Sequence, residues 1–327
     1  MGKLIKLAFV DFEPGFVPEQ SVFYRLLLQN YRVELSKNPD YLFFSHYGER
    51  HLRYDCIRIF YSKDPIAPDF NFCDYAIGQE YLTLGDRYFR FPEYYLDPET
   101  FAQMNDKTYF TSSNIRSKGN FCGFWYRNEE QTPERDLIFE RIKAYKAADA
   151  AGPLHNTLEG VVSEKQAFLE KCKFSIAFEA CSHPGHTSDA LMQAFAAQTI
   201  PIYWGNPFIG REFNTQAFVN CHDFRSWREV IEAVRRIDQD DDLYLKMMRS
   251  PALSGPERGI ERMEENLLAF LSSIFDQPLE RARRLSRSAA RSEFEKRARC
   301  EALLYRISPV GWRDWIRRKL ARPDKRP

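Results

Sequence analysis

The chain has 327 residues, of which 44% are hydrophobic and 15% aromatic, and its net charge at pH 7 is +1. These values exclude a disordered scaffold and predict a globular protein long enough for two domains with sizeable cores. Apolar runs stay short of about 18 residues, and the N-terminal run LAFVDF is too short for a signal peptide. We therefore expect neither a membrane span nor a leader.

The first third of the chain alternates short apolar stretches with a helical one. Strands are predicted at 4–9, 32–35, 41–45, 56–61 and 75–78, and a helix near 18–29. This alternation predicts a parallel sheet covered by helices. Between Asn105 and Gly119 the periodicity is lost and turn formers collect, so the first domain is predicted to span 1–117.

A second alternation predicts another α/β domain at 118–276. Strands at 121–126, 174–178, 200–205 and 218–220 alternate with helices at 133–147, 163–171, 189–198 and 226–236. Two Rossmann-like α/β domains that face a cleft form the GT-B architecture of many sugar-nucleotide glycosyltransferases. Other two-domain proteins share this alternation, so the fold class by itself does not decide the function.

The predicted strand at 174–178 leads into a polar loop, HPGHTSD, that ends on helix-capping residues. Free backbone N–H groups at a helix N-terminus attract anions. The loop has no lysine or arginine, so any cation for an anionic ligand has to come from elsewhere in the fold.

The last segment, 277–327, has 16 basic and 6 acidic residues and is predicted to form a helical tail. Its stretch VGWRDWIRRKLA places Trp312, Trp315, Ile316 and Leu320 on one side, a pattern typical of helices that lie on a membrane surface. Nucleic acid is the alternative partner for such charge. The aromatic face, without a recognised nucleic-acid fold, favours an anionic membrane and no nucleic acid.

The seven cysteines are odd in number and have no zinc-ligand spacing. They indicate reduced, mostly buried thiols in a cytoplasmic protein. Together with the tail, this predicts a cytoplasmic protein held peripherally on the inner face of the plasma membrane.

Asp64 directly follows the predicted strand CIRIFYS, and Pro65 after it favours an extended backbone. Ligands of open parallel sheets bind at the carboxyl ends of the strands, where a carboxylate is able to take a proton from a sugar hydroxyl. An ordinary turn-forming aspartate is the alternative interpretation.

Arg135 lies in the first turn of a predicted helix, with Ile138 and Ile142 on the same side. A guanidinium beside a helix N-terminus suits a diphosphate, because it forms paired hydrogen bonds and keeps its charge. A surface arginine paired with Glu134 or Asp136 is the alternative.

Two motifs resemble metal sites. Asp238-Gln-Asp240-Asp241-Asp242 is similar to an Asp-x-Asp motif, but a solvated turn that caps a helix explains it better. His183 and His186 have no third ligand nearby in the sequence, so we expect no metal there.

The stretch from Lys173 to Phe224 resembles the α-1,3/4-fucosyltransferases of glycosyltransferase family 10, especially the bacterial ones. Their signature has Phe-Glu-Asn, Thr-Glu-Lys, Pro-Ile-Tyr-x-Gly and Phe-Val-Asn-x-x-Asp-Phe, and here Phe178-Glu179, the strand 200–205, 212–214 and 218–224 match it. Weaker similarity covers HNTLEG (155–160), the helix of Arg135 and YSKDPIAPDFNFCDYAIG (61–78).

The resemblance implies a GT-B transferase that needs no metal or other cofactor and moves fucose from GDP-fucose with inversion. It makes 1–117 the acceptor-side domain and 118–276 the nucleotide-sugar donor domain. It puts Asp64 in the place of the family's glutamate base. It also implies a donor site made of Arg135, Glu179, His186, Ser188, Asp189, Tyr203 and Gly205.

Four positions depart from the family pattern. Ala180 stands for Asn, His186 for Tyr, Asp189 for Glu and Ala190 for Lys. A changed donor sugar, a site in which Arg135, His186 or backbone N–H groups replace the lysine, and a degenerate protein are the competing explanations. We favour a working transferase that moves fucose or a related deoxy or amino sugar from a GDP-sugar to a lipopolysaccharide-type surface glycan. A non-catalytic sugar- or nucleotide-binding accessory protein of polysaccharide assembly is the alternative.

Overall fold

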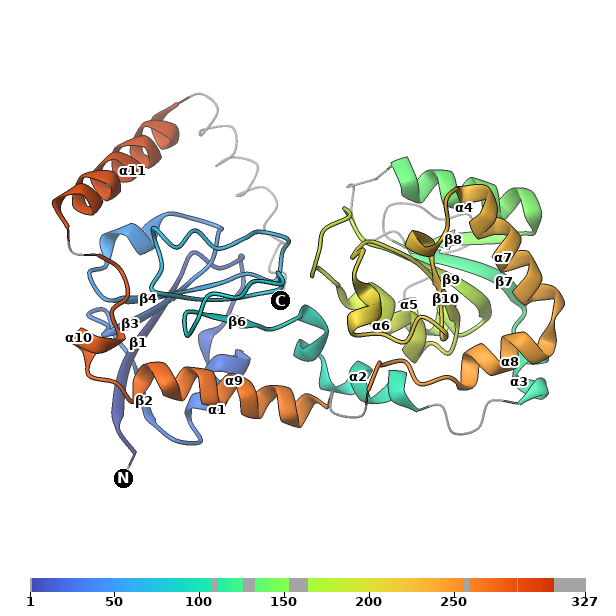
Figure 1. Ribbon diagram of the computed structural model, residues 1–327, viewed down its shortest axis with the longest axis horizontal. Coiled ribbons are helices and arrows are strands. Elements are labelled where there is room, and N and C mark those ends of the chain that lie inside the picture. Colours follow the sequence, from blue (N-terminus) through green and yellow to red (C-terminus); the bar gives the residue numbers. More distant parts are fainter. Residues whose placement is uncertain are drawn as a thin grey trace, which may run out of the picture. The chain divides into compact units, whose positions relative to one another are not determined.

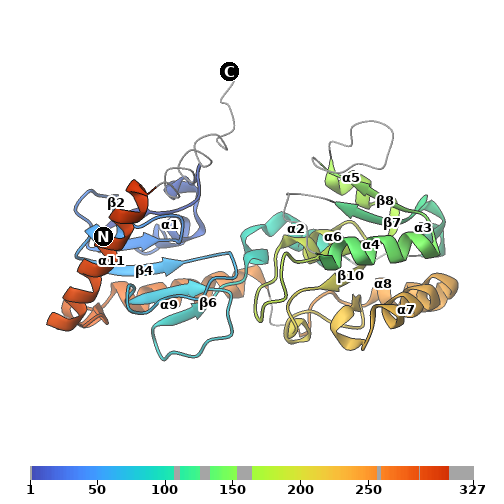
Figure 2. The ribbon, with the colours of Figure 1, turned by 90° about the horizontal axis from the view of Figure 1, so that it is seen from above.

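The computed structural model describes residues 2–106, 111–125, 133–152, 164–255, 259–286 and 288–308. The chain divides into two compact units. Unit 1 is Met1–Gly78, Leu82–Phe91 and Glu264–Pro327, and unit 2 is Gln79–Tyr81 and Pro92–Met263. Each unit has one sheet of parallel strands (Figures 1 and 2), so the predicted pair of Rossmann-like domains is confirmed.

The sheet of unit 1 has the strand order β2-β1-β3-β4-β5-β6. The strands are β1 (Leu4–Val10), β2 (Arg32–Leu35), β3 (Tyr41–Phe44), β4 (Ile57–Tyr61), β5 (Tyr75–Gly78) and β6 (Tyr88–Arg90). The first five agree with the sequence prediction. β6 was not predicted, because its three residues are too few for a periodic pattern and pairing with β5 defines the strand.

Aromatic rings from two helices pack against aromatic rings of the sheet in unit 1. Helix α1 (Val22–Leu27) buries Phe23 against Phe43 of β3, with ring centroids 5.2 Å apart. Helix α9 (Ile260–Phe275) brings Phe275 to Tyr41, with centroids 4.5 Å apart. Each buried ring contributes on the order of 2 kcal/mol. These contacts explain why residues 264–276 belong to unit 1 and not, as predicted, to the second domain.

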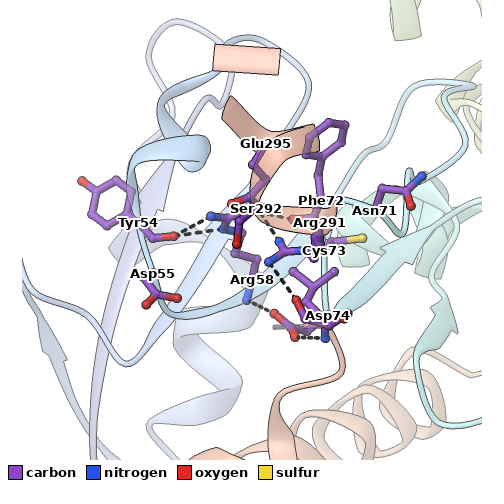
Figure 3. A network of polar contacts seen from close by, with 12 residues as sticks. Tyr54, Asp55, Arg58, Asn71, Phe72, Cys73, Asp74, Arg291, Ser292 and Glu295 are labelled. Atoms are coloured by element: carbon purple, nitrogen blue, oxygen red, sulfur yellow. Dashed lines mark hydrogen bonds and ion pairs between the residues drawn. The ribbon is translucent and has the colours of Figure 1, made fainter. Parts of the chain in front are cut away.

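The C-terminal segment is tied to unit 1 by buried charges (Figure 3). It contains α10 (Leu279–Ala282) and α11 (Ala289–Ile307). Glu295 of α11 accepts hydrogen bonds from Arg58 of β4 and, at 2.7 Å, from Arg291. The fully buried Asp74 accepts from the backbone N–H groups of Arg284 and Leu285, at 2.7 and 2.8 Å. Part of the basic tail is therefore folded structure.

The predicted second tail helix, VGWRDWIRRKLA, lies outside the described residues, as does HNTLEG. In the part of the chain that the structure describes, no helix is both long and apolar enough to cross a bilayer. Most of the seven cysteines are buried, as predicted: Cys56, Cys73, Cys122, Cys172 and Cys221.

The sheet of unit 2 has the order β11-β10-β9-β7-β8. The strands are β7 (Asn120–Trp125), β8 (Ala148–Ala151), β9 (Cys172–Phe178), β10 (Ile200–Trp204) and β11 (Val219–Asn220). The helices are α2 (Pro98–Asn105), α3 (Ser112–Ser117), α4 (Pro133–Tyr145), α5 (Lys165–Leu169), α6 (Asp189–Ala196), α7 (Trp227–Gln239) and α8 (Asp241–Arg249). β8 was not predicted, because ADAA reads equally well as helix.

Side chains of β9 alternate between the two faces of the sheet. Phe174, Ile176 and Phe178 join the cluster formed with α4, α7 and α8. The alternate residues Ser175 and Ala177 therefore face the other side, where α6 packs on β9. By the same alternation, the next side chain after the strand, Glu179, points to the face of α6.

Unit 2 begins earlier than the predicted boundary at 117/118. The edge of Tyr94 packs on Phe213, with centroids 5.1 Å apart, and α2 packs on α6. These contacts assign residues 92–105 to the second unit. The predicted boundary relied on the loss of periodicity near Asn105, which marks a loop but not the side on which the preceding helix packs.

Candidate active site

Glu179 is the central buried group of a polar cluster in unit 2. It comes directly after β9 and is 2% exposed. Its Oε1 accepts a hydrogen bond of 3.0 Å from the backbone N–H of Ser188, at the start of α6. Burial raises the pKa of Glu179 to about 7, although the hydrogen bonds from Ser188 and the charge of Arg135 oppose that shift.

Gly205 follows the neighbouring strand β10 and leaves room for Glu179. A Cβ atom at position 205 would lie 2.1 Å from Cγ of Glu179. Tyr203, on the same strand, is fully buried, and its hydroxyl accepts a 2.9 Å hydrogen bond from the backbone N–H of Asn206. Both residues thus support the loop geometry. A direct contact of either residue with a sugar nucleotide stays a prediction.

His186 is buried in the polar loop and held in one tautomer. Oε1 of Gln79 accepts from the backbone N–H of Thr187 at 3.2 Å, which directs the amide Nε2 of Gln79 to Nδ1 of His186 at 3.1 Å. The amide donates, so Nδ1 is the acceptor and the ring proton is on Nε2. That nitrogen is 3.7 Å from Oε2 of Glu179. The place of His186 in a donor site stays a prediction.

Arg135 brings a permanent cation to the same edge of the sheet. It lies in the first turn of α4, and its Nη2 donates a 2.9 Å hydrogen bond to the carbonyl oxygen of Phe178, the last residue of β9. The structure therefore places Arg135 beside Glu179, as its effect on the carboxyl's pKa also indicates. Arg135 is thus a cation close to the start of the polar loop, and its role toward an anionic ligand stays a prediction.

Ser188 and Asp189 begin α6. Oγ of Ser188 accepts from the backbone N–H of Ala190 at 3.2 Å and caps the helix. Oδ2 of Asp189 accepts from the side chain of Gln193 at 2.8 Å, and Gln193 in turn contacts Lys165 of α5. The predicted donor-site residues of unit 2 are thus gathered at the carboxyl ends of β9 and β10, around the N-terminus of α6.

Asp64 lies in unit 1, three residues after β4, with its side chain 36% exposed. Its Oδ2 accepts a 2.8 Å hydrogen bond from the hydroxyl of Tyr47 and lies 3.2 Å from Nε2 of His46. These two residues follow β3, which is the neighbour of β4 in the sheet. Neither residue was predicted from the sequence. The polar run Ser45 to Tyr47, directly after an apolar strand, was the signal that could have indicated them.

Asp11 holds the loop that carries His46 and Tyr47. It follows β1 in a left-handed conformation with φ of 60° and is 3% exposed. Its carboxylate accepts from the backbone and ring nitrogens of His51, at 2.8 and 2.9 Å, and its carbonyl accepts from the backbone N–H of Tyr47 at 3.0 Å. Burial favours the neutral acid, but the hydrogen bonds from His51 outweigh it and lower the pKa of Asp11.

The acidic run 238–242 has structural roles. Asp240 caps α8 through the backbone N–H of Leu243 at 2.9 Å, as predicted. Asp238 is not solvated as expected, because it pairs with Lys173 at 2.7 Å and Lys146 at 3.1 Å. Within the described ranges, no three His, Cys, Asp or Glu side chains are grouped as metal ligands.

Two family models match most of the chain. The Alpha-(1,3)-fucosyltransferase FucT N-terminal domain matches residues 7–97, and Glycosyltransferase family 10 (fucosyltransferase) C-term matches residues 115–249. Asp64 falls within the first range, and Arg135 and the cluster around Glu179 fall within the second.

The chain is also similar to individual proteins of this kind. It is 29% identical to Alpha-(1,3)-fucosyltransferase FucT of Helicobacter pylori over 298 residues, which cover 79% of this chain and 62% of that protein. It is 26% identical to Putative fucosyltransferase R654 of Acanthamoeba polyphaga mimivirus, over 54% of this chain and 32% of that protein. The chain thus spans less than two thirds of the length of these relatives.

A solved structure shares the fold. The crystal structure of an alpha1,3-fucosyltransferase with GDP superposes with a TM-score of 0.71 at 24% identity and covers 87% of this chain and 94% of that one. The likeness confirms the GT-B class.

Replacing Glu179 by Gln should change how stability depends on pH. The folded wild type keeps a proton that the unfolded chain releases, so its stability falls as pH rises from about 4.5, the ordinary pKa, to about 7. The variant lacks this titration. Its free energy of unfolding relative to wild type, from urea denaturation, should therefore rise by roughly 3 kcal/mol across that window. Glu164→Gln, which changes an exposed glutamate of unit 2, is the control. An equal difference at pH 4.5 and 7.5 would contradict the raised pKa.

Proposed function

Because the chain belongs to the fucosyltransferases of glycosyltransferase family 10, we propose that it is an inverting glycosyltransferase. It moves fucose, or a related deoxy or amino sugar, from a GDP-sugar to a hydroxyl of a surface glycan of the lipopolysaccharide type. The observation that carries this proposal is the cluster around Glu179. There a helix N-terminus and the guanidinium of Arg135 meet at the carboxyl end of β9, an arrangement suited to a nucleoside diphosphate.

In the proposed reaction, Asp64 accepts the proton of the acceptor hydroxyl. The acceptor oxygen forms a bond to the anomeric carbon while the bond from that carbon to the diphosphate breaks, and the electron pair leaves with GDP. Arg135 and the N-terminus of α6 stabilise the leaving diphosphate. Backside attack inverts the anomeric centre. No step of this scheme requires a metal ion.

The departures from the family pattern bear on the donor pocket. Ala190 has no cation, and Arg135 lies at the carboxyl end of β9, so in the proposed site Arg135 compensates for the missing lysine together with the backbone N–H groups at the start of α6. Ala180 and His186 stand in place of the family's Asn and Tyr, so the proposed donor pocket differs from the family pattern in the size and polarity of these side chains. We favour a working enzyme with an altered donor pocket over a degenerate one, because Asp64 and Arg135 are both retained in places that match the family pattern.

Asp64→Asn should lower kcat at least about 100-fold, because the amide does not accept the acceptor's proton. The measurement is turnover with GDP-fucose and other GDP-sugars, together with calorimetry of GDP, whose dissociation constant should not change. Glu19→Gln, an exposed acidic residue of the same unit, is the control. A parallel assay in EDTA tests metal independence. GDP binding without turnover by the wild type would support the alternative, an accessory protein of polysaccharide assembly.

Arg135→Ala should raise the dissociation constant of GDP about 10-fold to 100-fold, because a hydrogen-bonded charge is lost from the diphosphate. Isothermal titration calorimetry measures the change. Arg141→Ala, at an exposed position of the same helix, controls for the loss of an arginine. An unchanged constant in Arg135→Ala would remove this residue from the donor site.

We further propose that the protein acts at the inner face of the plasma membrane. Because basic residues before position 309, such as Arg283 and Arg291, pair with acidic residues within the fold, we assign this function to 309–327, which has seven basic and two acidic residues and both tryptophans of the tail. Deleting 309–327 should reduce binding to anionic vesicles, with salt weakening the binding of the full chain, and should spare turnover of a soluble acceptor. Equal sedimentation of both proteins with the vesicles would exclude this role.

A further inference from the structure

The carboxylate of Asp64 is held on one oxygen by two neighbours from another loop. The hydroxyl of Tyr47 donates to Oδ2 at 2.8 Å, and Nε2 of His46 is 3.2 Å from the same atom. Resting on the proposed role of Asp64 as the base, we infer that Tyr47 and His46 are positioning residues. They orient the carboxylate so that Oδ1 receives the proton of the acceptor hydroxyl.

The surroundings of His46 direct a proton toward Asp64. Nδ1 of the ring lies 3.4 Å from the hydroxyl oxygens of both Ser45 and Ser62. The hydroxyl of Ser62 donates to the carbonyl oxygen of Asp64 at 3.3 Å, so the hydroxyl of Ser45 is the donor to Nδ1. The ring proton is then on Nε2, which lies 3.2 Å from Oδ2 of Asp64. Through Nε2, His46 is thus the second donor to the carboxylate.

The two donors leave the other oxygen available. In the described part of the chain, the hydrogen bonds and ion pairs of the Asp64 side chain all end on Oδ2. With 36% of the side chain exposed, the carboxylate is open to a ligand from solvent. The hydrogen bond of 3.1 Å from the backbone N–H of Asp64 to Oγ of Ser62 further limits its motion.

The loop that carries Tyr47 and His46 is itself held by the buried Asp11. Its carbonyl accepts from the backbone N–H of Tyr47 at 3.0 Å, and its carboxylate holds His51 at the far end of the same loop. Gly48 between them allows the close approach, because a Cβ there would lie 2.5 Å from Oδ1 of Asp11. The rings of His46 and Tyr47 also pack together, with centroids 4.1 Å apart. A loop so restrained keeps its two donors directed at Asp64.

The test compares Tyr47→Phe, His46→Ala and His46→Gln with wild type in the turnover assay. Tyr47→Phe and His46→Ala should lower kcat about 10-fold or more, and the dissociation constant of GDP should not change. His46→Gln, which keeps an N–H donor, should recover most of the loss. Tyr54→Phe is the matched control, because Tyr54 contributes its backbone carbonyl to Arg58 and not its hydroxyl.

A double-mutant cycle decides whether the residues act through Asp64. In the Asp64→Asn background, Tyr47→Phe should cause no further loss, since the base that it orients is gone. A further 10-fold loss in that background, or wild-type kcat in both Tyr47→Phe and His46→Ala, would overturn the inference while leaving the proposed function intact. Wild-type kcat in Asp64→Asn would instead refute the base itself. Urea midpoints verify folding, and the His46→Ala and His46→Gln pair provides the test if Tyr47→Phe does not fold.

Discussion

The buried carboxyl of Glu179 is the constraint on which the candidate donor site depends. A carboxyl group removed from water needs hydrogen-bond partners, and here the start of α6 provides one through the backbone of Ser188. That bond fixes where the polar loop ends and where the helix begins. The position of the Glu179 side chain also requires glycine at position 205, because no side chain fits beside Glu179 at the end of β10.

Unit 1 uses a similar device at the carboxyl ends of its own strands. Asp11 is buried after β1 and holds a loop through the backbone, as Glu179 does after β9. The pKa values of the two acids are shifted in opposite directions because their surroundings differ. His51 stabilises the charged form of Asp11 and lowers its pKa, whereas burial dominates at Glu179 and raises its pKa. In both units a buried acid gives rigid geometry to loops that carry the candidate functional groups.

The C-terminal segment shows how net charge misleads when positions are unknown. The excess of basic residues after Gln277 suggested a tail with its own partner, yet several of these charges are used inside unit 1. Arg291 pairs with Glu295, which also neutralises the buried Arg58, and Arg283 pairs with Asp55 at 2.6 Å. Removing one partner of a buried pair such as Arg58 and Glu295 lowers the free energy of unfolding by several kcal/mol. The segment up to residue 308 is therefore part of the folded unit.

The sequence by itself determined the class of fold and the positions of the key charges. Short apolar runs joined by helical stretches specify parallel sheets, and residues that follow such strands, like Asp64, lie at the ligand-binding edge. The family motifs and the loss of the lysine at Ala190 are also local features. Only the tertiary structure decided which groups surround these residues: Tyr47 and His46 at Asp64, Gln79 at His186, Lys146 and Lys173 at Asp238. Such partners are far apart in the chain, so they depend on strand order and on the packing of loops, neither of which leaves a periodic pattern in the sequence.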